Sequence, residues 1–134
     1  GARLVGEDDT ICWTEIVTPD EKGAERFYCG LFGWTVKPSE GGGPAGYLEI
    51  YREDQPIGGI LPMKGKWWGD VPGHFMPYFQ VRDCDAAAAK AAELGGGATV
   101  PPMDIPHVGR FAVLHDDQWA HFSVIAPLPM PETA

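Results

Sequence analysis

The chain has 134 residues, enough for one domain with a sizeable core, and its 44% hydrophobic and 22% charged residues are ordinary for a soluble globular protein. Its net charge of -9 disfavours nucleic acid as a partner, because a phosphate backbone needs a cationic surface. No apolar run approaches the roughly 18 residues of a membrane span, and the first residues lack a secretory apolar segment, so we expect a cytoplasmic protein without membrane contact.

The first predicted elements are a strand that ends near Val17 and a helix that stops at Gly33. Thr18 and Glu21 have the spacing of a capping box, with Pro19 at the favoured first helical position. Helical spacing of i, i+3, i+4 and i+7 predicts one buried face on this helix, made of Ala24, Phe27, Tyr28 and Leu31.

Three more strands are predicted to start near Trp34, Gly46 and Pro56, with turns at 41–43 and 53–56. A segment rich in Gly and Trp, MKGKWWGDVPG, then connects residues 63–73 to the second half of the chain. There the order repeats: a strand, a helix capped by Asp83 or Asp85, a run of glycines at 95–97, and three further strands with a turn at 116–119.

The two halves align when the sequence is moved by about 63 residues, which places EIVTPDEKGAERFYCGLFG on YFQVRDCDAAAAKAAELGG. Neither half alone could bury its sheet face, so we expect a single domain over 1–134 with modules at about 10–62 and 74–127. The predicted class is α+β, with two βαβββ modules. The three cysteines, Cys12, Cys29 and Cys84, form no disulfide or metal motif and are interpreted as small buried hydrophobic residues.

TPDxxxAxxFYxxLFGW in one half and GRFAVLxDxQxAxFxxI in the other resemble the vicinal oxygen chelate superfamily of glyoxalases, bleomycin-resistance proteins and extradiol dioxygenases. PPxDIPxVGRFAV resembles an actinobacterial branch labelled glyoxalase-like or, provisionally, hydroxylase. The resemblance covers about residues 11–127. It implies a curved mixed sheet that forms a cup with the helices outside, and a homodimer whose paired face the sequence does not indicate.

The resemblance also implies a metal site, with one ligand from the first and one from the last strand of each module. The corresponding positions here are Trp13, approximately Gly58, Met76 and Ser123, and none is a usual ligand of a divalent ion. We therefore expect neither a metal nor another cofactor at the inherited position. The turn before the last strand carries Trp119 where the family usually has Gly, which predicts a reshaped turn or a Trp that projects over the pocket.

Strand alternation places residues two apart on the same face of a sheet. If Trp13 faces the cup, the other cup residues follow from it: Glu15, Val17, His74, Met76, Tyr78, Gln80, His121 and Ser123. Trp67 and Trp68 could close the opening, and Arg110 could pair with Glu15 or bind an anionic ligand group. An apolar pocket with few polar groups is typical of a small-molecule site. Each of these side chains has a structural alternative, such as a core hydrogen bond for Glu15 or packing for the two tryptophans.

Three functions remain open at this stage. The first is a metal-independent protein that binds a small molecule, aromatic or natural-product-like, between Trp and Tyr faces. The second is a metal-free enzyme in which Glu15 and His121 act as an acid–base pair on a carbonyl-bearing substrate. The third is a displaced metal site built from Glu15, His74 and His121. A structural or interaction role is the fallback.

Overall fold

The computed structural model describes residues 6–40 and 43–129, and the chain divides into two compact units. We call Trp13–Pro77 the α1 unit, and Gly1–Cys12 together with Tyr78–Ala134 the α2 unit. Residues 41–42, which belong to the turn predicted at 41–43, lie outside the described residues. Each unit is described by itself.

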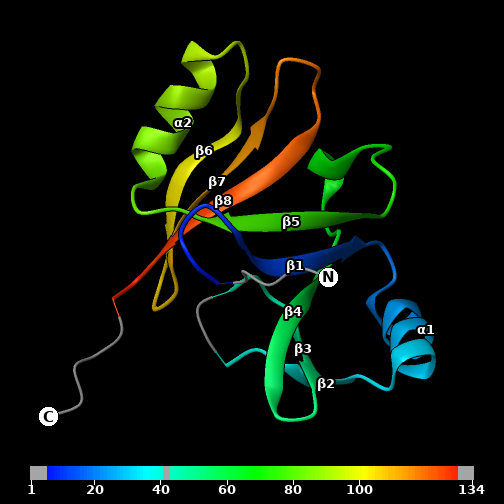
Figure 1. Ribbon diagram of the computed structural model, residues 1–134. Helices are drawn as coiled ribbons and strands as arrows, with labels where there is room; N and C mark the ends of the chain where they lie inside the picture. The colour runs from blue at the N-terminus through cyan, green and yellow to red at the C-terminus, as the bar shows by residue number, and fades with distance from the viewer. Residues whose placement is uncertain (1–5, 41–42, 130–134) are drawn as a thin grey trace, which may run out of the picture. The chain divides into compact units, whose positions relative to one another are not determined.

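The α1 unit contains a strand, a helix and three more strands (Figure 1). Strand β1 (Ile11–Thr18) begins in the α2 unit with its first two residues and continues here. It is followed by α1 (Glu21–Phe32), β2 (Thr35–Pro38), β3 (Leu48–Arg52), β4 (Gln55–Pro62) and a short 3₁₀ helix, η1 (Lys66–Trp68). The strand order is β2-β3-β4-β1, in which β1 and β4 are parallel and the other pairs are antiparallel.

The α2 unit repeats this plan. Strand β5 (His74–Gln80) leads from the α1 unit into α2 (Cys84–Glu93), β6 (Gly97–Ile105), β7 (Gly109–His115) and β8 (His121–Pro127). The strand order is β5-β8-β7-β6, again with one parallel pair, β5 and β8. The predicted α+β class with two βαβββ modules is confirmed. The cup shared by both modules depends on their relative placement and stays a prediction.

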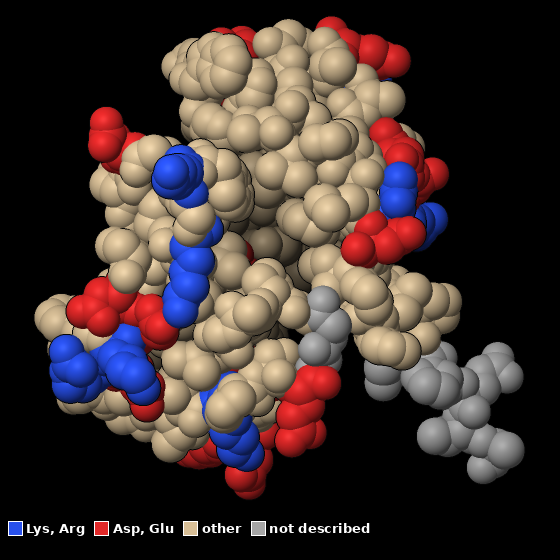
Figure 2. Space-filling view, turned by 180° about the vertical axis from the view of Figure 1, so that it is seen from behind, with Lys and Arg blue, Asp and Glu red and all other residues tan. Residues whose placement is uncertain are grey.

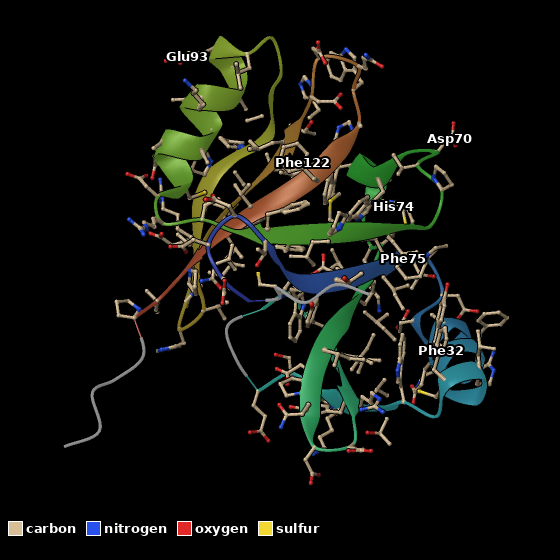
Figure 3. The ribbon with its side chains drawn as sticks, viewed as in Figure 1. Phe32, Asp70, His74, Phe75, Glu93 and Phe122 are labelled. Atoms are coloured by element: carbon tan, nitrogen blue, oxygen red, sulfur yellow. The ribbon has the colours of Figure 1, made fainter. Side chains whose placement is uncertain are left out.

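Each unit has its own hydrophobic core between its helix and its sheet. In the α1 unit, Ile16, Ile50 and Ile60 are buried against Ala24 and Tyr28 of α1. In the α2 unit the buried residues are Cys84, Ala112, Leu114 and Val124, with Phe79 and Phe122 packed edge to face beside them (Figure 3). Burial of each such aliphatic side chain contributes about 1.5–3 kcal/mol. Both cores fix which residues of each strand face the helix and which face away from it.

The helix starts differ slightly from the predicted ones. Asp20, not Thr18, caps α1: its carboxylate accepts a hydrogen bond from the Gly23 backbone at 3.0 Å. The Thr18 hydroxyl instead accepts from the backbone N–H of Asp20 at 3.2 Å, so the predicted capping box is wrong by two residues. Asp83 caps α2 as predicted, by accepting from the backbone N–H of Ala86.

The buried face predicted for α1 is only half correct. Ala24 and Tyr28 pack on the core, but Phe27 and Leu31 are 63% and 61% exposed. The helix rests on β4 and β2, and stacked rings of Tyr28, Phe32 and Trp34 cover the end of its packing surface. Phe27 and Leu31 therefore point away from the sheet, although their spacing predicted that they would pack on it.

The charges are mixed over the surface in view. On the face shown in Figure 2, most Lys and Arg atoms lie beside Asp or Glu atoms. The net charge of the whole sequence is -9. The absence of a nucleic-acid partner stays a prediction. In the part of the chain that the structure describes, no helix is both long and apolar enough to cross a membrane.

Candidate functional site

Glu15 lies on the face of the α1-unit sheet opposite helix α1, which we call the helix-free face. Its neighbour Ile16 belongs to the core beneath α1, so alternation turns Glu15 and Trp13 to the other side. Glu15 is only 6% exposed. This side agrees with the alternation expected from the sequence, while the place of Glu15 in a ligand site stays a prediction. A buried carboxylate on this face needs polar partners.

Tyr47 supplies one partner and links two of the predicted site residues. Its hydroxyl donates to Glu15 Oε2 at 2.9 Å and accepts from the indole Nε1 of Trp13, also at 2.9 Å. An indole nitrogen can only donate, so the hydroxyl hydrogen must point to the carboxylate. The direction of this chain, from Trp13 through Tyr47 to Glu15, is therefore fixed, and Glu15 is the acceptor at its end.

Two adjacent glycines in β4 make room for this arrangement. Gly59 pairs with Glu15 in the parallel ladder, and a Cβ at Gly59 would overlap the hydroxyl and ring of Tyr47. A Cβ at Gly58 would overlap the backbone carbonyl oxygen of Thr14. Sequence reasoning missed Tyr47 and Gly59. The available signal was the glycine pair inside the apolar strand PIGGILP, which marks a close approach of other atoms.

A second carboxylate in the same unit has a similar environment. Glu49 accepts from Ser39 at 3.3 Å and from the Tyr51 hydroxyl at 2.7 Å. The hydrogen bond to Glu49 raises the pKa of Tyr51, because the phenol loses a favourable bond when it ionises. The ammonium of Lys37 lies 4.6 Å from the centre of the Tyr51 ring. Tyrosine hydroxyls thus bind both Glu15 and Glu49.

The residues at the inherited metal positions do not fit a divalent ion. The Trp13 indole is a donor and is bonded to Tyr47, while Gly58 and Gly59 have no room for a side chain. Met76 and Ser123 are not usual ligands. Across residues 6–40 and 43–129, no three His, Cys, Asp or Glu side chains are grouped so that they could hold a metal. The displaced set of Glu15, His74 and His121 spans both units and stays a prediction.

The other predicted site residues of the α1 unit lie near its connector. His74 borders a cavity of about 390 Å³ beside α1, which Phe27, Tyr28 and Phe75 also line, and its Nδ1 is 2.8 Å from the carbonyl oxygen of Pro72. Figure 3 shows His74 and Phe75 at the start of β5. Met76 is buried. The rings of Trp67 and Trp68 in η1 stack on each other at 4.1 Å, and Trp67 is exposed.

The helix-free face of the α2 unit carries the remaining residues. Tyr78 pairs with Ser123 in the ladder, whereas Phe79 and Val124 face the core. The residues predicted for this face are Tyr78, Gln80, His121 and Ser123, and alternation from the core residues Phe79 and Val124 turns them to this side, while their role in a site stays a prediction. Ser123 is fully buried, and its hydroxyl is without a hydrogen-bond partner within the described structure. The Gln80 amide donates to Asp8 at 3.3 Å.

His121 belongs to a cluster that the sequence did not predict. Its Nε2 lies 3.0 Å from the Thr99 hydroxyl and its Nδ1 lies 2.9 Å from the carbonyl oxygen of Trp119. His115 is its direct ladder partner and stacks on the indole of Trp119 with 3.9 Å between ring centres. His115 is not among the site residues predicted from the sequence. The sequence signal for this pairing was the position of His115, six residues before His121 and on the other side of a tight turn.

Trp119 adopts a left-handed backbone, with φ of 67°, that bulky residues rarely take. Asp116 holds the turn, because its carboxylate accepts from the backbone N–H groups of Ala120 at 2.9 Å and Gln118 at 2.8 Å. These bonds lower the pKa of Asp116, with nearby histidines adding a smaller effect. The turn keeps the conformation that a glycine would favour, and the Trp ring projects onto His115.

Arg110 differs from its expected place. It donates to Asp85 through Nε at 2.8 Å and Nη2 at 3.1 Å, and to Asp104 through Nη1 at 3.1 Å. These bonds lower the pKa of Asp85 and raise that of Arg110. Alternation puts Arg110 on the same side as the core residues Ala112 and Leu114. Arg110 therefore anchors the start of α2 within its own unit, and its predicted pairing with Glu15 or with an anionic ligand group stays a prediction.

Comparisons with known proteins give curated relatives and similar structures. A scan against models of protein families finds no match. The chain is 44% identical over 131 residues to a Mycobacterium bovis protein provisionally named glyoxylase CFP32, covering 96% of this chain and 48% of that protein. It is 34% identical to the anthracycline biosynthesis protein DauV of Streptomyces sp., covering 93% and 44%. The chain thus spans about half the length of the curated relatives it matches.

Solved structures share the fold at low identity. A Streptomyces coelicolor methylmalonyl-CoA epimerase variant, solved with 2-nitronate-propionyl-CoA, has a TM-score of 0.62 and 18% identity, over 89% of this chain and 97% of that chain. The Mycobacterium tuberculosis methylmalonyl-CoA epimerase has a TM-score of 0.61 and 14% identity, over 95% of both chains. At this identity the likeness concerns the fold, and these enzymes show that the fold can hold a small molecule.

Proposed function

Since the chain belongs to the vicinal oxygen chelate superfamily and has its glyoxalase-like fold, we propose that it binds a small aromatic molecule without the help of a metal. The observation that carries this proposal is the half-buried chain of hydrogen bonds from Trp13 through Tyr47 to the buried carboxylate of Glu15, on the helix-free face of the α1 unit. It presents two aromatic side chains and one carboxylate side by side. Small-molecule sites commonly combine apolar surfaces with a few placed polar groups.

The aromatic class of ligand follows from the side chains and is supported by the relatives. Trp and Tyr faces bind planar molecules by stacking and cations by contact with the ring. One relative is named for anthracycline biosynthesis, and another carries a glyoxylase name, so both names point to small organic compounds. A planar hydroxylated ketone could stack on the aromatic rings and donate a hydrogen bond from its hydroxyl group to the carboxylate of Glu15.

Metal independence is part of this proposal. The inherited positions offer Trp13, a glycine pair that leaves no space for a carboxylate, Met76 and Ser123. The polar contact to the ligand is expected from Glu15 instead, whose carboxylate accepts hydrogen bonds from hydroxyl groups. Binding is expected to be unchanged after exhaustive treatment with EDTA and to be unaffected by added Zn²⁺, Mn²⁺ or Ni²⁺.

The test is calorimetric titration with danthron, a planar dihydroxy ketone. Replacing Tyr47 by Phe removes the hydrogen bonds that hold Trp13 and Glu15 in place beside each other, so we expect binding to weaken about tenfold, or ~1.4 kcal/mol. Tyr51→Phe is the matched control, because Tyr51 has the same kind of bond to a carboxylate but is not linked to Trp13. Equal binding by both variants, or a strict metal requirement, would overturn the proposal.

An enzymatic role is a second candidate, and one observation favours it. The fixed direction of the hydrogen bonds leaves Glu15 as an acceptor, which is the state that a general base requires. The pairing of Glu15 with His121 stays a prediction, because the two residues belong to different units. If turnover of a carbonyl compound is found and Glu15→Gln retains full kcat, Glu15 is not the base.

A further inference from the structure

The two strands β7 and β8 carry a pair of histidines that the proposed ligand site does not use. His115 and His121 are direct partners in the antiparallel ladder, so their side chains leave the sheet on the same face. Their ring centres are 5.7 Å apart. Both residues belong to the α2 unit, whereas the hydrogen bonds that end at Glu15 belong to the α1 unit. What this pair can bind is therefore independent of the proposed aromatic ligand.

The hydrogen bonds of the two rings leave the same nitrogen of each with a free lone pair. His115 Nδ1 lies 2.9 Å from the carbonyl oxygen of Asp116, and His121 Nδ1 lies 2.9 Å from that of Trp119. A carbonyl oxygen only accepts, so each Nδ1 carries a hydrogen, and in the neutral ring Nε2 is then unprotonated. Metal-binding histidines have this arrangement, in which the other ring nitrogen often donates to a backbone carbonyl. Both rings thus have the tautomer that a metal ligand requires.

Trp119 holds both rings in place. Its carbonyl oxygen accepts from His121, and its indole stacks on His115 with 9° between the ring planes. It does so from a left-handed backbone, with φ of 67°, which is costly for a bulky residue. A glycine would fit this turn without strain. The presence of an indole therefore points to a function that depends on the orientation of the two histidines.

The neighbouring strand β6 leaves both Nε2 atoms within reach of an ion. A Cβ at Gly97 would come 2.9 Å from His115 Nε2, so glycine at this position leaves that nitrogen uncovered. His121 Nε2 lies 3.0 Å from the hydroxyl of Thr99, which a rotation of the threonine side chain releases. Gly97 and Thr99 are two positions apart on β6. Both Nε2 atoms are thus directed to the same part of this strand.

The separation of the rings fits one shared ion. A metal–nitrogen bond of about 2.1 Å places the ion about 3.2 Å from the centre of an imidazole ring. Two rings on one ion then have centres about 5.2 Å apart at a tetrahedral angle and about 6.4 Å apart when they lie opposite each other. The observed 5.7 Å lies between these values. Backbone hydrogen bonds and, to a smaller extent, both histidines lower the pKa of Asp116, so a negative charge lies beside the rings and favours a cation.

We propose that His115 and His121 together bind one first-row transition-metal ion through their Nε2 atoms. Imidazole nitrogens suit Cu²⁺, Ni²⁺ and Zn²⁺, and the usual order of affinity places Cu²⁺ first. No third His, Cys, Asp or Glu of the described residues completes the group, so water fills the remaining positions of the ion. The site uses none of the four inherited metal positions.

NMR of the imidazole nitrogens, with Ni²⁺ as the probe, tests this proposal. Ni²⁺ is paramagnetic and, unlike Cu²⁺, does not oxidise the free cysteines of the chain. Before Ni²⁺ is added, the spectra should show the hydrogen on Nδ1 of His115 and His121. A substoichiometric amount of Ni²⁺ should then broaden the signals of these two rings before those of His74 and His107, which are the internal controls.

Replacing one ligand distinguishes a paired site from binding to single histidines. His115→Gln and His121→Gln should each weaken Ni²⁺ binding at least about tenfold, measured by calorimetric titration. His107→Asn is the matched control and should bind as wild type does, since Asn suits the left-handed backbone at that position. Circular dichroism confirms that each variant is folded. Unchanged binding by both glutamine variants, or equal broadening of all four histidines, overturns the proposal.

Trp119→Gly tests whether Trp119 positions the two rings. Glycine adopts the left-handed backbone without strain, so the turn is expected to keep its conformation. Without the indole, His115 loses its stacking partner, and Ni²⁺ binding should weaken about tenfold although both ligands are still present. A folded Trp119→Gly protein that binds Ni²⁺ as tightly as wild type overturns the positioning role of Trp119.

Discussion

The α1 and α2 units follow the same order of elements but treat the polar groups of their helix-free faces differently. In the α1 unit, Tyr47 joins Trp13 to Glu15, and Gly59 in β4 leaves room for the tyrosine. In the α2 unit, the corresponding last strand carries Ser123, whose buried hydroxyl has no hydrogen-bond partner in the described structure. The two units thus share their topology but differ in how the buried polar atoms on their helix-free faces are hydrogen-bonded.

The two helices differ in the same sense. Helix α2 is made of small residues that pack closely on its own sheet, while α1 carries large aromatic residues that its own sheet does not cover. The topology of a module therefore does not determine which of its surfaces are available to other molecules. The available surfaces depend on the size of the side chains on the helix and on the position of glycines in the last strand. Both features differ between the two modules.

The largest difference between the units is expected at Gly59. Gly59→Ala places a methyl group against the Tyr47 hydroxyl and ring, so either the tyrosine or strand β4 must move. We expect a loss of about 3 kcal/mol in the free energy of unfolding, measured by urea denaturation.

Gly73→Ala serves as the control, since its nearest contact would be an ordinary 3.4 Å to the carbonyl oxygen of Val17. The double variant Gly59→Ala/Tyr47→Ala should recover part of the stability that the single Gly59 variant loses, because the overlap is gone. A Gly59→Ala protein as stable as wild type would show that Tyr47 does not occupy this place.

Acid is expected to weaken the α2 unit before the α1 unit. Three carboxyl groups of the α2 unit have a lowered pKa: hydrogen bonds from Arg110 act on Asp85, backbone N–H groups on Asp116, and Arg82 on Asp8. A lowered pKa in the folded state means that these groups stabilise the fold above their unfolded pKa, about 3.9. That contribution is lost as the pH falls from about 4 through the lower folded values.

Hydrogen exchange measured residue by residue by NMR, at successive pH values below about 5, tests this order. Amides of α2 and β7 should lose protection first. Arg110→Gln removes the hydrogen bonds to Asp85 and should bring the pKa of that carboxyl back toward its ordinary value, which a carbon-detected titration measures. If amides in the strands of the α1 unit lose protection first in wild-type protein, the expected order of acid unfolding is wrong.

The smallest effect is expected at Ser123. Ser123→Ala removes a hydroxyl that has no partner in the described structure, so the free energy of unfolding should change by less than about 1 kcal/mol, with stabilisation as the expected sign. Thermal unfolding monitored by circular dichroism measures it. A loss of several kcal/mol would show that this hydroxyl has a partner. Tyr47→Phe in the other unit provides the contrast, since it breaks two bonds.

Much of the fold could be predicted from the hydrophobic periodicity of the sequence and from the residues that start and end its helices. The repeat located both modules, Gly33 ended α1 with a left-handed φ of 73°, and Asp83 capped α2. Alternation along β1 correctly placed Trp13 and Glu15 on one face. These inferences rest on local geometry, which a sequence carries directly.

Contacts between residues distant in sequence were harder to predict. Tyr47 lies 32 residues from Glu15, just before β3, and the residues around it offered no sign of the hydrogen bond. Arg110 found Asp85 at the start of α2, 25 residues away, because the register of β7 turns it toward the helix. The burial of Phe27 was inferred from spacing alone, and spacing indicates that a face is suited to burial without indicating what covers it.

The glycine pair in β4 also limits how this sequence can change over time. A carboxylate at Gly59 requires the loss of the Tyr47 ring, and at Gly58 the obstacle is a backbone oxygen of Thr14 that no side-chain substitution removes. Introducing a metal ligand through this strand therefore needs at least two coordinated mutations, the first of which destabilises the protein. The contacts around Gly58 and Gly59 thus limit which substitutions β4 can accept, independently of any selection on function.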